Sequence, residues 1–163
     1  MAGLKQLKLL KHNYFFISHP IMINLQTENV KFTLKNKTLL KQWIKEVIVK
    51  KKRKAGEITF VFCNDDYLLN INKQYLNHDT FTDIITFDYS KEDSKQPISG
   101  DVFISIERVK ENALKYSKTF ENELHRVIIH GVLHLLGYTD KTKTTKEEMT
   151  RQENLCLKIF EKM

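Results

Sequence analysis

The sequence predicts a single α+β domain, a mixed sheet of about four strands packed with helices, and three observations favour it. Short segments rich in β-branched and aromatic residues alternate with longer segments whose apolar residues have a helical period. The chain has 163 residues, the length of one domain. Hydrophobic residues make up 41% of it, enough for a single core, and no repeat or linker divides it.

Four segments have the pattern of β-strands. Residues 23–34 alternate apolar and polar side chains, which is the period of a half-buried strand. Three later segments are shorter and richer in β-branched and aromatic residues, namely residues 57–63, 84–89 and 101–106. The polar stretches 77–83 and 91–99 are expected to be loops, because neither has an apolar period.

Five segments have the pattern of helices. The first follows Asn36 or Thr38, either of which can cap it, and its apolar face includes Trp43. Asn64 is predicted to cap the second helix, whose apolar stripe extends to Tyr75. The other three predicted helices are residues 107–118, 121–136 and 144–162, the last opened by a capping box of Thr144 and Glu147.

Pro20 separates a basic, partly apolar N-terminal stretch from the first predicted strand. This stretch lacks the long apolar centre and the small-residue cleavage site of a signal peptide. Residues 1–21 are therefore expected to be a disordered extension or a start-site artefact, with Met22 as the true initiator, and residues 22–163 to be the domain. No segment reaches the roughly 18 apolar residues of a membrane span, so no membrane partner is expected.

The formal net charge of +7 favours polyanionic partners such as nucleic acids. Part of that charge lies in the basic run of residues 50–54, which is interpreted as a solvated corner. The two cysteines, Cys63 and Cys156, lie far apart among apolar neighbours. They are predicted to be buried free thiols, which fits a reducing cytoplasm.

A metal site is predicted on a central helix and the loop that follows it. His130 and His134 are four residues apart, so both imidazoles lie on one helical face and can bind a single ion. Gly137 is placed to end the helix, and Asp140 beyond it can supply a third ligand. Three protein ligands leave a fourth position to a metal-bound water, as in catalytic zinc sites.

Two histidines at this spacing can also be an ordinary core or surface pair. The flanking residues favour the metal, because they make this helix the most apolar one in the chain, and buried imidazoles need partners. A zinc peptidase of the H-E-x-x-H type is disfavoured, because Gly131 stands where such an enzyme has its general base.

The segment resembles the signature of the YbeY family of ribosomal-RNA-processing metalloproteins, H-G-x-L-H-L-x-G-Y-D-H. The matching residues are His130, Gly131, Leu133, His134, Leu135, Gly137 and Tyr138. The resemblance runs from Met22 to the C-terminus. Residues 72–87 are similar to the family's N-x-x-Y-R-x-x-D-x-x-T-D-V-L-S-F, residues 100–104 to its G-D-I-x-I strand, and Met149 and Glu153 to its M-x-x-x-E.

The resemblance implies a single-strand-specific, zinc-dependent endoribonuclease of the cytoplasm. Its partners would be ribosomal RNA and the small ribosomal subunit, and its role the maturation of the 3′ end of small-subunit ribosomal RNA and ribosome quality control. The alternatives are a non-catalytic, metal-stabilised ribosome assembly factor and a hydrolase with another substrate.

Two departures from the family pattern bear on the site. Asp140 stands where the family has its third histidine, so Zn²⁺ is expected but Mn²⁺ or another oxygen-preferring divalent metal competes better. Leu76 stands where the family has an arginine, which removes that cation. The residues that could replace it in substrate binding are Lys73, His78 and Arg126.

The remaining site residues have both functional and structural interpretations. Asp83 and Glu123 are the catalytic candidates, although Asp83 can instead cap the turn before its strand. Glu123 lies on the same helical face as His130 and is expected to be within reach of it as a polar partner. Met149 and Glu153 are expected mainly to pack the last helix against the domain.

Overall fold

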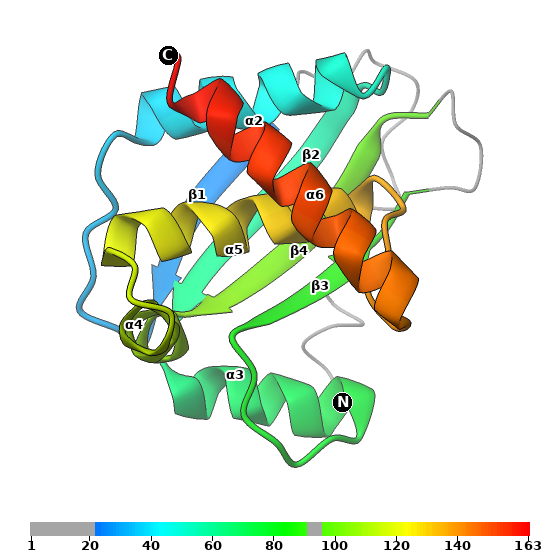
Figure 1. The fold of residues 1–163 in the computed structure, drawn as a ribbon. Coiled ribbons are helices and arrows are strands. Elements are labelled where there is room, and N and C mark those ends of the chain that lie inside the picture. Colours follow the sequence, from blue (N-terminus) through cyan, green and yellow to red (C-terminus); the bar gives the residue numbers. More distant parts are fainter. Residues whose placement is uncertain (1–21, 91–95) are drawn as a thin grey trace.

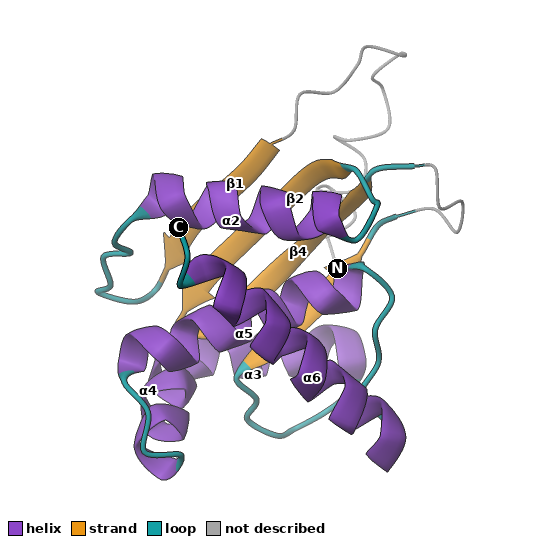
Figure 2. Cartoon of the chain, turned by 45° about the horizontal axis from the view of Figure 1, so that its top comes forward, coloured by secondary structure: helices purple, strands orange, loops and turns teal. Residues whose placement is uncertain are grey.

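The computed structural model describes residues 22–90 and 96–163, so the predicted extension 1–21 lies outside the described residues. A four-stranded sheet lies at the centre of the domain, with helices on both of its faces (Figures 1 and 2). This arrangement confirms the predicted α+β class.

The sheet is mixed. Its strands, in the order β1-β2-β4-β3, are β1 (Met22–Glu28), β2 (Ala55–Cys63), β4 (Ile98–Ser105) and β3 (Ile84–Asp88). The first three are parallel to one another, and β3 is antiparallel to β4 along one edge.

The first strand is shorter than predicted. It ends at Glu28, because Asn29 has a φ of 53° and turns the chain out of the sheet. Val30 and Phe32 are nevertheless packed against the core, and Leu34 is buried in it. Their apolar period therefore arises from side chains that cover the core without backbone pairing, which a sequence pattern does not distinguish from a strand.

Helices α2 (Lys37–Lys50), α5 (Phe120–Leu135) and α6 (Lys143–Phe160) cover one face of the sheet (Figure 1). The short helix α4 (Ile106–Lys115) follows β4 directly and packs against α5. The main core lies between this helical layer and the sheet, and Trp43 is fully buried in it. The Trp43 indole N–H donates to the carbonyl oxygen of Cys156 at 2.9 Å, which joins α2 to α6.

The other face carries α3 (Asp65–Ile71), which continues into a π-helical turn, η1 (Asn72–Leu76). Its core is much smaller: Cys63, Leu68, Ile71 and Ile85 are buried, and Phe87 and Phe103 are only partly covered. The turn ends at Asn77, whose φ of 55° reverses the chain toward the loop before β3.

The predicted caps are partly confirmed. The Asn64 side chain accepts the Tyr67 amide hydrogen bond at 2.9 Å and so caps α3. The capping box of α6 is formed by Thr142 and Thr145, two residues before the predicted pair of Thr144 and Glu147, because the helix begins two residues earlier than a cap at Thr144 implies.

Both cysteines are free and buried, as predicted. Burial raises the pKa of the Cys63 thiol to about 12 and that of Cys156 to about 11, so both are protonated at neutral pH. In the part of the chain that the structure describes, no helix has the length and apolar character needed to cross a membrane.

Candidate metal centre

Helix α5 is the most deeply buried helix of the domain and approaches the sheet closely at Gly131. A Cβ atom at this position would lie 2.6 Å from Val102 Cγ1 and 3.0 Å from Ile84 Cδ1, so a larger residue fits only if these side chains or the helix shift. Gly131 therefore fixes the height of the helix above β3 and β4. The two histidines on either side of it are positioned by this contact.

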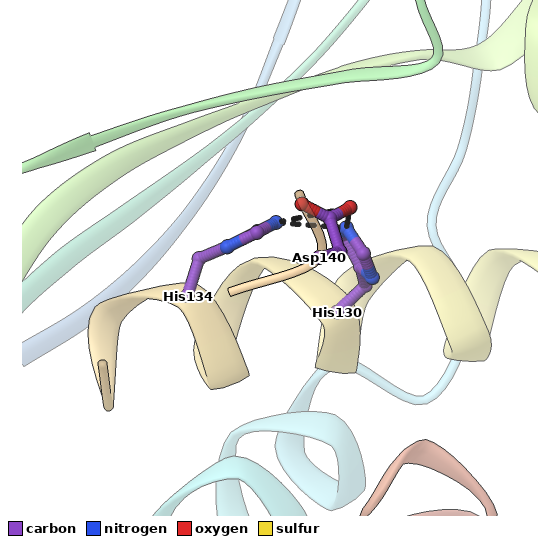
Figure 3. Close-up of side chains that lie close together, drawn as sticks. All are labelled: His130, His134 and Asp140. Atoms are coloured by element: carbon purple, nitrogen blue, oxygen red, sulfur yellow. Dashed lines mark hydrogen bonds and ion pairs between the residues drawn. The ribbon is translucent and has the colours of Figure 1, made fainter. Parts of the chain in front are cut away.

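The side chains of His130, His134 and Asp140 converge on one point, as predicted (Figure 3). The two Nε2 atoms are 2.9 Å apart, and Asp140 Oδ2 lies 3.6 Å from that of His130 and 3.9 Å from that of His134. One ligand atom from each residue lies within 4.8 Å of the others.

The turn after α5 brings Asp140 to the histidines. Gly137 has a φ of 93°, a left-handed conformation that glycine adopts without strain. The Tyr138 amide donates back to the Leu133 carbonyl oxygen at 3.0 Å, the longer bond of a Schellman motif. The helix ends there, and the chain folds back so that Asp140 lies above the ring edges in Figure 3.

Hydrogen bonds to Nδ1 of each imidazole fix the orientation of the ring and the position of its hydrogen. His134 Nδ1 lies 3.0 Å from the Tyr138 carbonyl oxygen, which can only accept, so this nitrogen carries the hydrogen. His130 Nδ1 lies 2.7 Å from Glu153 Oε1. Both Nε2 atoms can therefore present lone pairs, which is the form of histidine that binds a metal.

This donor set fits a divalent cation. Two lone pairs and a carboxylate facing one another repel unless a positive charge lies between them. Ligands of a tetrahedral zinc ion at its usual bond lengths are roughly 3.3 Å apart, close to the separations in this cluster. Two imidazoles and one carboxylate are also a known set of ligands for catalytic zinc.

The two rings differ in their electrostatic environment. Burial disfavours the charged form of both. At His130 the hydrogen bond to Glu153 and the charges of Glu153, Asp140 and Asp83 outweigh burial, so its pKa is raised. At His134 burial and the neighbouring His130 dominate, so its pKa is lowered.

The polar partner of His130 is Glu153 on α6, whereas the sequence analysis placed Glu123 in that position and Glu153 among packing residues. Glu153 is buried and also pairs with Arg126, whose Nη1 lies 2.8 Å from Oε2. A sequence signal for this role exists. Glu153 lies on the buried stripe of α6 with Met149, Gln152 and Cys156, and an acid on such a stripe needs a partner.

The two catalytic candidates do not line the cleft beside His134. Glu123 is 5% exposed, and burial raises the pKa of its carboxyl group. The Asp83 carboxylate accepts a hydrogen bond from the Asn112 side chain at 3.0 Å.

A cleft of about 570 Å³ opens beside His134. One wall is formed by the end of α5 and the turn after it, and the other by η1, the following loop and β3. Residues of the second wall include Leu76, His78, Phe81, Thr82 and Thr86. The Thr86 hydroxyl oxygen is buried and, among the described residues, has no hydrogen-bond partner.

The structure separates the three cations proposed to replace the missing arginine. His78 lines the cleft together with His134. Lys73 pairs with Asp79 at 2.8 Å and does not line it. Arg126 is bound to Glu153 and to Asn154, so its guanidinium supports the ligand His130 instead of facing the cleft.

Comparisons with known proteins agree with this geometry. The sequence model of the family described as "Endoribonuclease YbeY" matches residues 22–161. Proteins named endoribonuclease YbeY from Flavobacterium psychrophilum and Phocaeicola vulgatus are each 48% identical to the chain over 139 residues, which is 85% of this chain and 96% and 99% of theirs.

A solved structure is also similar. The solution structure of the protein TM1509 from Thermotoga maritima matches with a TM-score of 0.58 and 28% identity, over 86% of this chain and 93% of that one. A family match over most of the chain, relatives aligned over almost their whole length and a shared fold lead to one conclusion: this chain belongs to the YbeY endoribonuclease family.

Proposed function

We propose that this protein is a metal-dependent endoribonuclease that cuts single-stranded RNA. One observation carries the proposal: in a chain of an endoribonuclease family, His130, His134 and Asp140 converge beside an open cleft. The proposed substrate is ribosomal RNA on the small subunit, in the maturation of its 3′ end and in ribosome quality control, and the proposed location is the cytoplasm.

The proposed cofactor is one Zn²⁺ ion held by His130, His134 and Asp140, with Mn²⁺ as the competing metal because one of the ligands is a carboxylate. When bound, the ion supplies Lewis acidity toward a phosphoryl oxygen and toward the water that attacks phosphorus. The protein contributes the fixed orientation of the ligands, through Glu153 and the Tyr138 carbonyl group.

The second wall of the cleft is proposed to bind the RNA. Phe81 is 52% exposed and its ring is held from one side by the Arg108 guanidinium, 5.0 Å from the centroid, so an RNA base can stack on it. Of the three candidate cations, His78 is proposed to contact the phosphate, because it lines the cleft. Asp83 and Glu123 are proposed to act on the site through their charge and not by touching the substrate.

A ribosome assembly factor whose metal is structural is the second candidate. Leu76 favours it, because this side chain lines the cleft where the family pattern has an arginine. A neutral side chain there gives the RNA backbone one cation fewer.

The test is cleavage of labelled small-subunit ribosomal RNA by the purified protein, with and without a chelator. His134→Ala removes a ligand, and His125→Phe is the matched control, because His125 lies on the same helix but packs against Trp43 and Phe160. Cleavage that needs metal, is lost in His134→Ala and persists in His125→Phe supports the enzyme. Binding without cleavage by the metal-loaded protein rejects it in favour of the assembly factor.

A further inference from the structure

A second hollow, of about 320 Å³, adjoins the cleft beside His134. It is lined by Lys51, Arg53, Leu136, Gly137 and Tyr138. Gly137 and Tyr138 also line the first cleft, so the two hollows meet at the turn that ends α5. A chain lying in the cleft beside His134 can therefore continue over this turn into the second hollow, here called the basic pocket.

Lys51 is held in place without being neutralised. Its ammonium group donates to the Tyr138 hydroxyl at 3.3 Å and to the Gln152 side-chain oxygen, and it lies 5.2 Å from the centroid of the Tyr138 ring. All of these partners are uncharged. The nearby Glu148 carboxylate is bound by Arg151 and Gln152. Lys51 is thus fixed at the pocket, and although its charge helps to lower the pKa of the Glu148 carboxyl group, it forms no ion pair with a carboxylate among the described residues.

Arg53 differs from the other three arginines of the chain. Arg108, Arg126 and Arg151 each pair with a carboxylate at 2.7–2.8 Å. Within residues 22–90 and 96–163, Arg53 has no such pair, and the one hydrogen bond of its side chain is a long one, 3.5 Å from Nη2 to the Gln96 carbonyl oxygen. Its Nε atom is buried and has no acceptor there.

An unpaired buried N–H is costly, and a second cation beside it adds repulsion. An anionic oxygen in the pocket relieves this repulsion. The open surface at Gly137 leaves room for the approach, since a Cβ there would have no neighbour within 4 Å. The pocket therefore has the chemistry of a phosphate site: two cationic side chains, neither of them in an ion pair among the described residues, beside open space.

We propose that the basic pocket binds a backbone phosphate of the RNA strand, next to the part of the strand that lies at the metal. This inference rests on the proposed function and adds a direction to it: the strand runs from the cleft across Gly137 and Tyr138 to Lys51 and Arg53. The basic run of residues 50–54 then contains side chains of two kinds. Lys52 and Lys54 are exposed, as expected of a solvated corner, whereas Lys51 and Arg53 are partly buried and line the pocket.

The test compares Arg53→Gln with Lys54→Gln. Both variants remove one positive charge from the same turn, but the Lys54 side chain is exposed and does not line the pocket. Binding of a fluorescent single-stranded RNA of about 12 nucleotides, a typical single-strand site size, is measured by anisotropy at several salt concentrations, with a chelator present. Arg53→Gln is expected to make the negative slope of log affinity against log salt shallower by about 0.7, the value for one phosphate contact on a single strand.

Lys54→Gln is expected to leave that slope unchanged, and Arg53→Lys, which keeps the charge, to restore most of it. With metal added, Arg53→Gln is expected to raise KM for the same RNA several-fold and to leave kcat unchanged. Wild-type cleavage with equal slopes for Arg53→Gln and Lys54→Gln overturns the basic pocket alone. Wild-type protein that neither binds nor cleaves the RNA overturns the proposed function and the pocket together.

Discussion

The two walls of the cleft beside His134 are built in different ways. On the α5 wall, each ring nitrogen of His130 and His134 has a polar neighbour, and the helix beneath them is buried between α6 and the sheet. On the opposite wall, Leu76 and Phe81 are 42% and 52% exposed. Leu76 is the last residue of the π-helical turn η1, and Phe81 lies in the loop after it. The core behind that wall is the smaller of the two.

This difference indicates that the two walls have different roles. The metal ligands are positioned by packing and by hydrogen bonds from two separate elements, which holds them in one geometry. The opposite wall has few such constraints, so its side chains can adapt to different bases along a strand. Changes on the first wall are expected to alter metal affinity or stability, and changes on the second to alter only RNA binding.

Glu153→Gln is expected to have the largest effect. It removes the charge that orients His130 and leaves Arg126 without its carboxylate partner. Metal affinity is expected to fall by about 10–100-fold, the usual cost of losing the partner of a ligating histidine. Titration calorimetry with Zn²⁺ measures it, and Glu147→Gln, an exposed glutamate on the same helix, is the control. Equal affinities in the two variants would show that α6 does not hold the site.

Gly131→Ala is expected to have an intermediate effect, and its sign is informative. In an open helix this change is stabilising, because alanine has the better helix propensity. Here the added methyl group meets Val102 and Ile84, so a loss of about 1 kcal/mol or more in the free energy of unfolding is expected. Urea unfolding of the metal-free protein measures it. A gain in stability would contradict the close packing of α5 on the sheet.

Leu76→Arg is expected to have the smallest effect and to act on the opposite wall alone. A cation there is expected to make the negative slope of log RNA affinity against log salt steeper by about 0.7, while stability changes by less than about 0.5 kcal/mol. Leu114→Arg is the control, because Leu114 is 81% exposed on α4 and does not line the cleft. A similar gain in both variants would mean that charge alone, and not its place on the wall, determines binding.

Much of the fold follows from local sequence patterns. The four strands and the order of the helices were predicted from apolar period and composition, because each element is long enough to show its period. The failures are local or depend on tertiary contacts. Residues 30–34 keep a strand-like period because their side chains reach the core after Asn29 has turned the chain away.

In the candidate site, too, local patterns predicted some residues, and others depend on tertiary contacts. His130 and His134 could be placed on one face because the spacing of a helix is fixed, and Gly137 predicted the turn that returns Asp140 to them. Glu153 could not be identified as the partner of His130 in the same way. Glu153 and His130 are far apart in the sequence and come together only when α6 packs across α5. The apolar pattern of either helix alone does not determine how the two helices cross.

The buried thiols have a practical consequence. The chain has two cysteines, and both are enclosed in the core with raised thiol pKa values, so neither reacts readily with a maleimide while the protein is folded. The native cysteines of the wild-type chain therefore do not need to be replaced before a new cysteine is introduced for site-specific labelling. A single Lys54→Cys substitution, at the exposed rim of the turn that carries Arg53, attaches a dye without removal of any native residue from the core. Energy transfer between that dye and a second dye on the RNA then reports how far each labelled end of a bound strand lies from residue 54.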